Sequence, residues 1–166
     1  MTISRTERGA TLVEAAVTSL VLFMLLLAVI DFGRAFNMYQ VMTDAAREGA
    51  RYAVAPIPGN PPTYPGPSQV ATHVCTYLQS GHVRPNSSGG CGLSGGAGPA
   101  CSAWPGSSLP ASVGPGVYVL QGCPETVNGI ATTYTEVDIK APFKFWMLPF
   151  TVNMTTRAAM RNETGD

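Results

Sequence analysis

The stretch ATLVEAAVTSLVLFMLLLAVI, residues 10–30, decides the fold of this chain. Its 21 residues carry a single charge, Glu14, and as a helix they would span about 30 Å, the thickness of a bilayer's hydrocarbon core. Arg5 and Arg8 precede the stretch, and this local density of positive charge favours a cytoplasmic N-terminus. The sequence therefore predicts one membrane-spanning helix close to the N-terminus.

Two other interpretations of this stretch must be weighed. A cleaved secretory signal has an apolar region of about 7–15 residues followed by a small-residue cleavage site. The apolar run here is longer, and the following VIDFGRAFN offers no such site. An uncleaved signal anchor has the same hydropathy, so the apolar run alone leaves that alternative open.

The composition limits the classes of function. The 166 residues have room for about one domain. Ten basic residues balance ten acidic ones, so the formal net charge is +0, which lacks the electrostatic footprint of a nucleic-acid-binding protein. Charged residues make up 12% and hydrophobic residues 45%, which argues against both a disordered chain and a soluble cytosolic enzyme.

Glu14 is the unusual residue of the apolar stretch. A carboxylate at the centre of a membrane helix costs about 2.5–3.5 kcal/mol on insertion scales. Glu14 lies near the predicted cytoplasmic end, where the side chain can reach towards water at a lower cost. Either it faces the interface or it meets a cation inside the apolar layer.

The residues around Glu14 resemble a known processing signal. Residues 8–14, RGATLVE, are similar to the class III signal of type IV pilin-like proteins. In that family a short basic leader ends in Gly, cleavage follows the Gly, and the fifth mature residue is Glu. The resemblance implies a leader over residues 1–9, cleavage between Gly9 and Ala10, and Glu14 as mature residue five.

The wider segment from Arg8 to Val54 resembles TadE-like proteins, which are minor pilin-like proteins of the Tad (tight adherence) pilus system. Ala15 departs from the Tyr that follows the Glu in the major pilins of that system, and this chain is much longer than those subunits. The resemblance therefore implies a minor pilin or pseudopilin, without enzymatic activity, that takes part in assembling a pilus for adhesion or secretion.

The implied partners follow from this resemblance. They are membrane lipid before assembly, a prepilin peptidase, other pilin-like subunits that pack through their N-terminal helices, and an inner-membrane assembly platform. The α-amine that cleavage creates at Ala10 would neutralise Glu14 of the same or of a neighbouring chain. The body would lie in the periplasm or on an extracellular pilus, and no nucleic acid, cofactor or metal is expected.

The helical pattern continues after Asp31, so we expect one helix over residues 10–54, of which 10–30 span the membrane. We single out helix-packing candidates of two kinds, aromatic and small: Phe32, Phe36, Ala45, Gly49 and Ala53. The three small residues repeat every four positions, which lets another backbone approach closely. That partner is either a neighbouring helix or the chain's own body.

The remaining chain is expected to form a Pro-rich linker, 55–68, and a loop-rich body, 69–166. Ser68 is expected to cap a helix over 69–80, and Asn128-Gly129 predicts a hairpin turn. Strands are expected over 117–121, 132–141 and 151–161, with residues 142–149 as a wide connection after the second. In the second strand Thr133, Thr135, Val137 and Ile139 alternate with Tyr134, Glu136, Asp138 and Lys140. The predicted class is α+β: a long N-terminal helix, a small antiparallel sheet, a short helix and long loops.

Four cysteines lie in this body: Cys75, Cys91, Cys101 and Cys123. None forms a C-x-x-C pair, and an even count outside the cytoplasm indicates two disulfides. Of the three possible pairings we favour Cys91–Cys101 with Cys75–Cys123. Motifs for catalysis are absent from the sequence: His73 and His82 are expected on a helix surface and in a loop, and the Gly-rich run 89–98 lacks the Lys-Ser/Thr of a phosphate-binding loop.

Two competing functions remain. One is a major subunit of a pilus-like filament, which differs from a minor subunit only in stoichiometry. The other is a signal-anchored periplasmic binding protein or enzyme, whose chain would keep its N-terminal leader.

Overall fold

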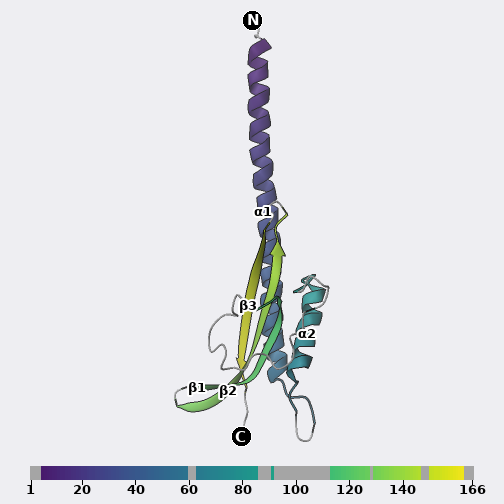
Figure 1. The fold of residues 1–166 in the computed structure, drawn as a ribbon, viewed down its shortest axis with the longest axis vertical. Coiled ribbons are helices and arrows are strands. Elements are labelled where there is room, and N and C mark those ends of the chain that lie inside the picture. Colours follow the sequence, from purple (N-terminus) through teal and green to yellow (C-terminus); the bar gives the residue numbers. More distant parts are fainter. Residues whose placement is uncertain are drawn as a thin grey trace.

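The computed structural model describes residues 5–59, 63–85, 91, 113–127, 129–146 and 150–162. These residues form a long helix, a shorter helix and three strands: α1 (Arg5–Val54), α2 (Pro67–Ser80), β1 (Gly116–Val127), β2 (Ile130–Lys144) and β3 (Thr151–Arg161). In Figure 1 the N-terminal half of α1 stands clear of everything else, while α2 and the sheet flank its C-terminal half. The α+β class predicted from the sequence is confirmed.

Helix α1 contains 50 residues and no proline, and it would measure about 75 Å. It begins at Arg5, so the described part of the expected leader is already helical. Residues 1–4 lie outside the described residues. The helix ends at Val54, just before Pro56, which has no backbone N–H to continue the hydrogen-bond ladder.

The sheet is a three-stranded antiparallel meander in the order β1-β2-β3. The β1–β2 pairing closes on Val127 and Ile130, and Gly129 has a φ of 82°, a left-handed conformation that glycine adopts at little cost. This fits the predicted turn, although Asn128 lies outside the described residues. β1 runs six residues further than predicted, past an irregularity between Leu120 and Cys123 where Gly122 has a φ of 69°.

β2 also extends beyond its prediction, through Pro142 to Lys144, so the expected wide connection begins later. The pairing with β1 ends at Lys140, and Pro142 pairs only with Asn153 of β3. The missing N–H of Pro142 therefore removes no hydrogen bond between β1 and β2. The sequence predicts that Pro142 ends the strand, and this prediction is wrong because Pro142 lies where β2 has β3 as its one described neighbour. The third strand has the predicted bounds.

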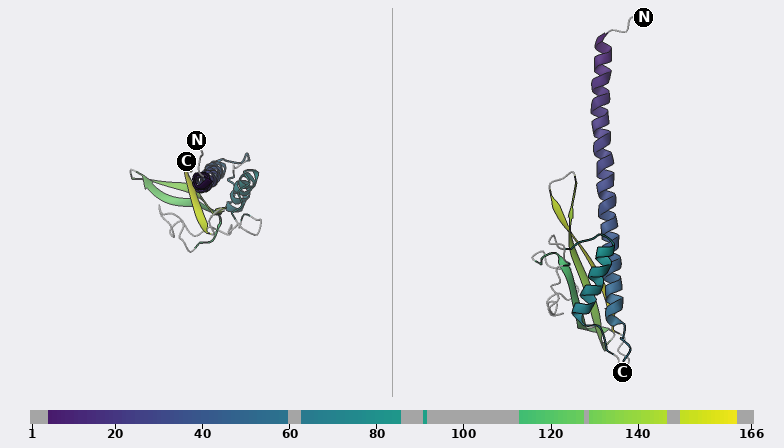
Figure 2. Two further views of the ribbon diagram at one scale, coloured as in Figure 1. Left: turned by 90° about the horizontal axis from the view of Figure 1, so that it is seen from above. Right: turned by 90° about the vertical axis from the view of Figure 1, so that its right-hand side faces the viewer.

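The core lies between the two helices and one face of the sheet. Figure 2 shows α1 and α2 side by side on the same side of the strands. Small residues of α1 meet β-branched residues of α2 and the sheet; the fully buried members include Met42, Ala45, Ala46, Ala50, Val70, Val74, Leu78, Val137 and Ile139. The sheet thus presents its aliphatic face to the helices, as the alternation of β2 and β3 predicts.

Two expectations for the body need correction. Helix α2 begins at Pro67 with Gly66 as its N-cap, not after Ser68, because Gln69 Oε1 accepts the Gly66 N–H and a proline suits the first helical turn. Cys75 is bonded to Cys91, so both favoured pairings, Cys75–Cys123 and Cys91–Cys101, are wrong. The Cα atoms of Cys75 and Cys91 are 5.7 Å apart, within the usual range for a disulfide. Cys123 is disulfide-bonded too, whereas Cys101 lies outside the described residues.

Candidate functional site

The N-terminal half of α1 is an apolar surface that no other described element covers. Most of its large apolar side chains are about half exposed or more, and only Leu27 among those described is partly buried. The exposed ones include Leu12, Val17, Leu20, Leu22, Phe23, Met24, Leu25 and Val29. Among the described residues, α1 is the helix that is long and apolar enough to cross a membrane. Its most apolar segment lies in this half, and 0% of the residues of that segment are buried. Soluble monomers seldom expose a contiguous apolar patch of more than a few hundred Å².

Two hydroxyl side chains of this half, those of Thr18 and Ser19, bond to the helix backbone. The Thr18 hydroxyl donates to the Glu14 carbonyl at 2.8 Å, and the Ser19 hydroxyl donates to the Ala16 carbonyl at 2.9 Å. A hydroxyl that is satisfied in this way can enter hydrocarbon without an unpaired donor. The segment is therefore suited to an apolar environment despite its Thr and Ser residues.

The predicted processing and assembly residues lie at the free end of the rod. Gly9, Ala10 and Glu14 are all exposed on consecutive turns of α1. In the part of the chain that the structure describes, no cation lies within salt-bridge distance of Glu14. A Cβ at Gly9 would meet nothing within 4 Å, so the fold of this chain places no steric demand on that glycine.

Asp31 marks the boundary between the two halves of α1. Its side chain is only 5% exposed, although it directly follows the apolar stretch. Oδ1 accepts a hydrogen bond from Arg34 at 2.8 Å, and Oδ2 accepts one from the backbone N–H of Trp146 at 3.0 Å. The end of the β2–β3 hairpin is thus joined to α1 at the point where the apolar half ends.

The helix-packing candidates divide into two sets. Phe32 and Phe36 are 72% and 55% exposed, near this boundary. Ala45, Gly49 and Ala53 are buried within the chain itself, and a Cβ at Gly49 would lie 2.2 Å from Val74 Cγ2 of α2. The small-residue ridge therefore serves the contact between α1 and α2, and the two phenylalanines are left accessible to another molecule.

The face of the sheet opposite the helices holds buried charges that the sequence analysis did not single out. Glu136 and Asp138 are 1% and 2% exposed, and Arg157 of β3 forms an ion pair with Glu136 and lies 4.0 Å from Asp138. Glu136 Oε1 and Asp138 Oδ2 have no hydrogen-bond partner among the described residues. The sequence feature that indicates this cluster is the i, i+2 spacing of Glu136 and Asp138, which places both carboxylates on the same face of one strand.

The electrostatics of this charged cluster follow from its burial. Desolvation, and then the neighbouring charge of Glu136, raise the pKa of Asp138 to about 7. Among the described residues, no group of three or more His, Cys, Asp or Glu side chains could hold a metal ion. The cluster is thus an internal ion pair with one carboxyl that protonates near neutral pH.

The two histidines lie in different surroundings. His73 of α2 stacks on Tyr52 with ring centroids 4.3 Å apart, and its Nε2 is 3.7 Å from Glu48 Oε1. The hydrogen bond from Arg51 is the main cause that lowers the pKa of Glu48. His82 is exposed in the turn after α2, where it lines a cavity with Arg34 and Lys144.

Comparison with known protein families gives a match within the long helix. Residues 9–51 match the family model of TadE-like proteins, which confirms the resemblance found in the sequence. The matched segment lies entirely within α1 and includes both its exposed half and most of its packed half. No curated protein and no solved structure matches this chain significantly.

Proposed function

We propose, from the premise that residues 9–51 are TadE-like, that this chain is a minor pilin-like subunit that helps to assemble a Tad pilus. The TadE-like match implies association with such a pilus. We propose in addition that the subunit is a minor one, that a prepilin peptidase processes it, and that the pilus serves adhesion or secretion. The chain acts through contacts and without catalysis of its own.

One observation carries this proposal: a single continuous helix has no buried residue over the described apolar segment and is packed against its own body over the other half. An apolar half of this kind needs a partner outside the chain. Lipid supplies it before assembly, and the apolar helices of other pilin-like subunits supply it afterwards. The same surface therefore serves membrane insertion and filament packing in turn.

Glu14 gives this packing its register. Cleavage after Gly9 would leave a cationic α-amine on Ala10, and the Glu14 carboxylate of a neighbouring subunit would neutralise it. Leaving one charge of a buried pair unpartnered costs about 3–5 kcal/mol, so only one axial alignment of adjacent helices satisfies both groups. The absence of a described intrachain cation at Glu14 is compatible with a partner from another subunit.

The proposed topology follows from the same features. The N-terminus lies on the cytoplasmic side of the inner membrane, residues 10–30 span it, and the body lies in the periplasm until the subunit joins a pilus. The disulfides at Cys75–Cys91 and at Cys123 suit an oxidising compartment. An inner-membrane assembly platform would receive the processed subunit.

The proposal is tested by the N-terminus of the native protein. Mass spectrometry of protein from a pilus-forming cell should find a chain that begins at Ala10. Gly9→Leu should retain the leader and appear as a larger band, whereas the matched control Gly33→Leu, at another exposed position of α1, should be processed normally. Native assembled protein that begins at Met1 would refute the proposal in favour of a signal-anchored protein.

A second experiment separates processing from assembly. Glu14→Gln removes the charge and keeps the size of the side chain, so we expect normal cleavage but loss of the subunit from sheared pili. Glu14→Asp keeps the charge and should be incorporated at least in part. Normal incorporation of the Gln variant would remove Glu14 from the assembly contact, and abundance in sheared pili comparable to the main subunit would make this chain a major subunit.

A further inference from the structure

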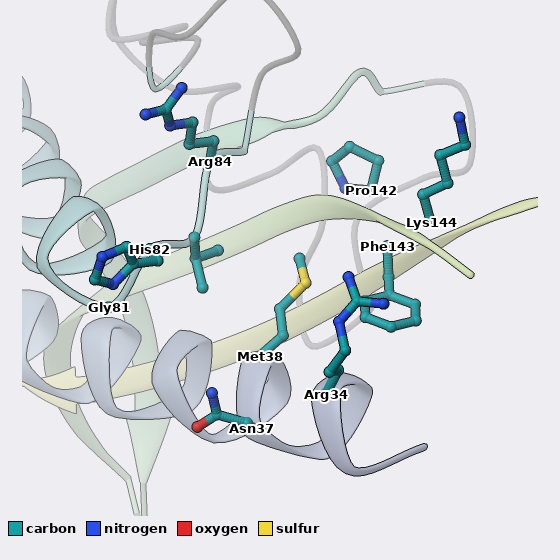
Figure 3. A pocket seen from close by; sticks show the side chains of 10 residues that line it. Arg34, Asn37, Met38, Gly81, His82, Arg84, Pro142, Phe143 and Lys144 are labelled. Atoms are coloured by element: carbon teal, nitrogen blue, oxygen red, sulfur yellow. The ribbon is translucent and has the colours of Figure 1, made fainter. Parts of the chain in front are cut away.

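A shallow cavity of about 320 Å³ lies where α1, the turn after α2 and the end of β2 meet. Four basic side chains from these three elements line it: Arg34, His82, Arg84 and Lys144. Figure 3 shows the Arg34 side chain beside the Phe143 ring, with Arg84 and Lys144 at opposite edges of the cavity. Met38 and Phe143 contribute apolar wall between them. The cavity is thus basic at its rim and partly apolar inside.

The local fold explains how the turn after α2 reaches this place. A Cβ at Gly81 would lie 2.4 Å from Val41 Cγ1, so the end of α2 can approach α1 closely only without a side chain there. His82 then takes a φ of 60°, the left-handed conformation, and reverses the chain. Arg84 is brought to the cavity by this reversal, next to residues that are about 50 positions away in sequence.

The positive charge of the cavity is incompletely neutralised. Arg34 is paired with Asp31, at 2.8 Å. Within the described ranges no carboxylate lies within salt-bridge distance of Arg84 or Lys144. The negative end of the α2 dipole is reduced as well, because the N–H groups of residues 81–83 bond to the carbonyls of residues 77–79. An anion at this place would meet two cationic side chains for which the described residues supply no acidic partner.

The position of the cavity along α1 identifies the source of that anion. Arg34 lies about 6 Å beyond Ile30 along the helix, and the headgroup layer on each side of a bilayer is about 5–7 Å thick. The chain just after Lys144 lies at the same level, because the Trp146 N–H bonds to Asp31 Oδ2. If residues 10–30 fill the hydrocarbon core, the rim of this cavity at Arg34 and Lys144 lies among the lipid headgroups. The opposite edge, at Arg84, lies further from the bilayer, because Gly81 packs on Val41, eleven residues beyond Ile30.

Aromatic side chains around the same level support this position. Trp146, Phe32 and Phe150 are 79%, 72% and 47% exposed, close to the end of the apolar half. The Phe145 and Phe150 rings contact each other at a centroid distance of 5.0 Å across the end of the β2–β3 hairpin. Aromatic residues, tryptophan above all, are enriched at membrane interfaces.

We propose that this cavity binds the phosphate-bearing headgroup of an anionic phospholipid, which enters at the rim beside Lys144 and Arg34 and extends to Arg84 at the far edge. The inference rests on the proposed function in one respect, namely that residues 10–30 span a membrane. The bound lipid fixes the depth and the rotation of the body against the bilayer before the subunit is extracted into a pilus. A free phosphate ion suits the site less well, because the cations stand at separate edges around a partly apolar wall.

The site is tested on the full-length protein by native mass spectrometry. Protein released from nanodiscs of equimolar phosphatidylglycerol and phosphatidylcholine should retain phosphatidylglycerol preferentially. Each cation near an anionic headgroup contributes about fivefold in affinity, so R84Q combined with K144Q should lower this preference about 25-fold. R84K combined with K144R keeps both charges and should keep the preference. R47Q combined with R161Q, which removes two exposed cations elsewhere, is the matched control.

Three results would overturn the proposal. They are equal retention of the two lipids by the unaltered protein, an equal loss in the R47Q/R161Q control, and displacement of the lipid by millimolar inorganic phosphate, which would make the site one for the free ion. Failure of the proposed function has a different signature: the protein would not fractionate with membranes at all. A protein that inserts but shows no lipid preference refutes the site alone.

Discussion

The two halves of α1 belong to one uninterrupted helix and have opposite surroundings. Over residues 10–30 the apolar side chains are large and exposed, whereas over residues 35–53 the residues that face the body are mostly alanine and glycine and are fully buried. The exposed half carries the greater hydrophobicity, yet the packed half forms the core. Hydrophobicity alone therefore does not identify the core of this chain, because small side chains are what allow α2 and the sheet to approach.

A matched pair of truncations should break this comparison most clearly. Met42 is 0% exposed and Met24 is 56% exposed, on the same helix. Met42→Ala should lower the free energy of unfolding of the body by about 2–4 kcal/mol, because it leaves a cavity in the core. Met24→Ala should change it by less than about 0.5 kcal/mol. Denaturant unfolding in detergent micelles, followed by near-ultraviolet circular dichroism, measures the free energy of unfolding of both variants. Equal losses of stability in the two would contradict the division of α1 into an exposed half and a packed half.

A pair of glycine substitutions sharpens the same contrast. A Cβ at Gly49 would lie 2.2 Å from Val74, whereas one at Gly33 would meet nothing within 4 Å. Gly49→Ala should therefore destabilise the body by about 1–2 kcal/mol through overpacking. Gly33→Ala should be neutral or stabilising by up to about 1 kcal/mol, because alanine favours the helix. Thermal unfolding of the two variants is the measurement, and a stabilised Gly49→Ala variant would show that the α1–α2 contact is looser than described.

The body contains a buried carboxyl group, that of Asp138, whereas Glu14 in the apolar half of α1 is exposed. The pKa of Asp138 is raised to about 7 in the folded body, so between about pH 4 and pH 7 the folded state holds a proton that the unfolded chain has released. Stability should therefore fall as the pH rises through this window. Asp138→Asn should flatten the dependence and be more stable at pH 8 by on the order of 1 kcal/mol.

The control for this experiment is Asp44→Asn, which alters an exposed carboxylate of α1 and should leave the pH dependence unchanged. Glu14→Gln should also leave it unchanged, because Glu14 is exposed and makes no ion pair with the body among the described residues. An unaltered pH dependence in Asp138→Asn would assign the proton to another group.

The smallest effect is expected on the outer surface of the packed half. Arg51 donates to Glu48 at 3.1 Å, three residues earlier on the exposed side of the helix. This contact holds the pKa of Glu48 below its ordinary value. Its contribution to the free energy of unfolding is therefore present above about pH 4.5 and is lost as the pH falls. Arg51→Gln should cost about 0.3 kcal/mol at neutral pH and low salt, and less at high salt. A loss above 1 kcal/mol would mean that Arg51 packs on the body.

Much of this architecture could be predicted from patterns that are local in sequence. The apolar run 10–30, the ridge Ala45–Gly49–Ala53 and the alternation over 151–161 each express a helical or extended period, and the structure places them in α1 and β3. The match to TadE-like proteins falls on the same segment. What the ridge would contact could not be predicted, because a small-residue stripe fits a neighbouring helix and the chain's own α2 equally well.

The features that were missed depend on contacts between segments far apart in sequence. Alternation placed Glu136, Asp138 and Lys140 on the face opposite the aliphatic residues, which usually means solvent, yet all three are buried. Lys140 Nζ, for example, donates to the Val113 carbonyl at 2.6 Å, 27 positions away. The basic cavity depends in the same way on where α2 ends against α1.

The continuity of α1 has a mechanical consequence. The helix passes from its apolar half to its packed half without a proline, and Asp31 joins the β2–β3 hairpin to it at the junction. A displacement of residues 10–30 along the helix axis must therefore carry the sheet through the same distance, and a rotation must turn it through the same angle. When such a subunit leaves the bilayer, each residue of travel lifts the whole body by about 1.5 Å, so the spacing of bodies along a filament would report directly on the stagger of their stems.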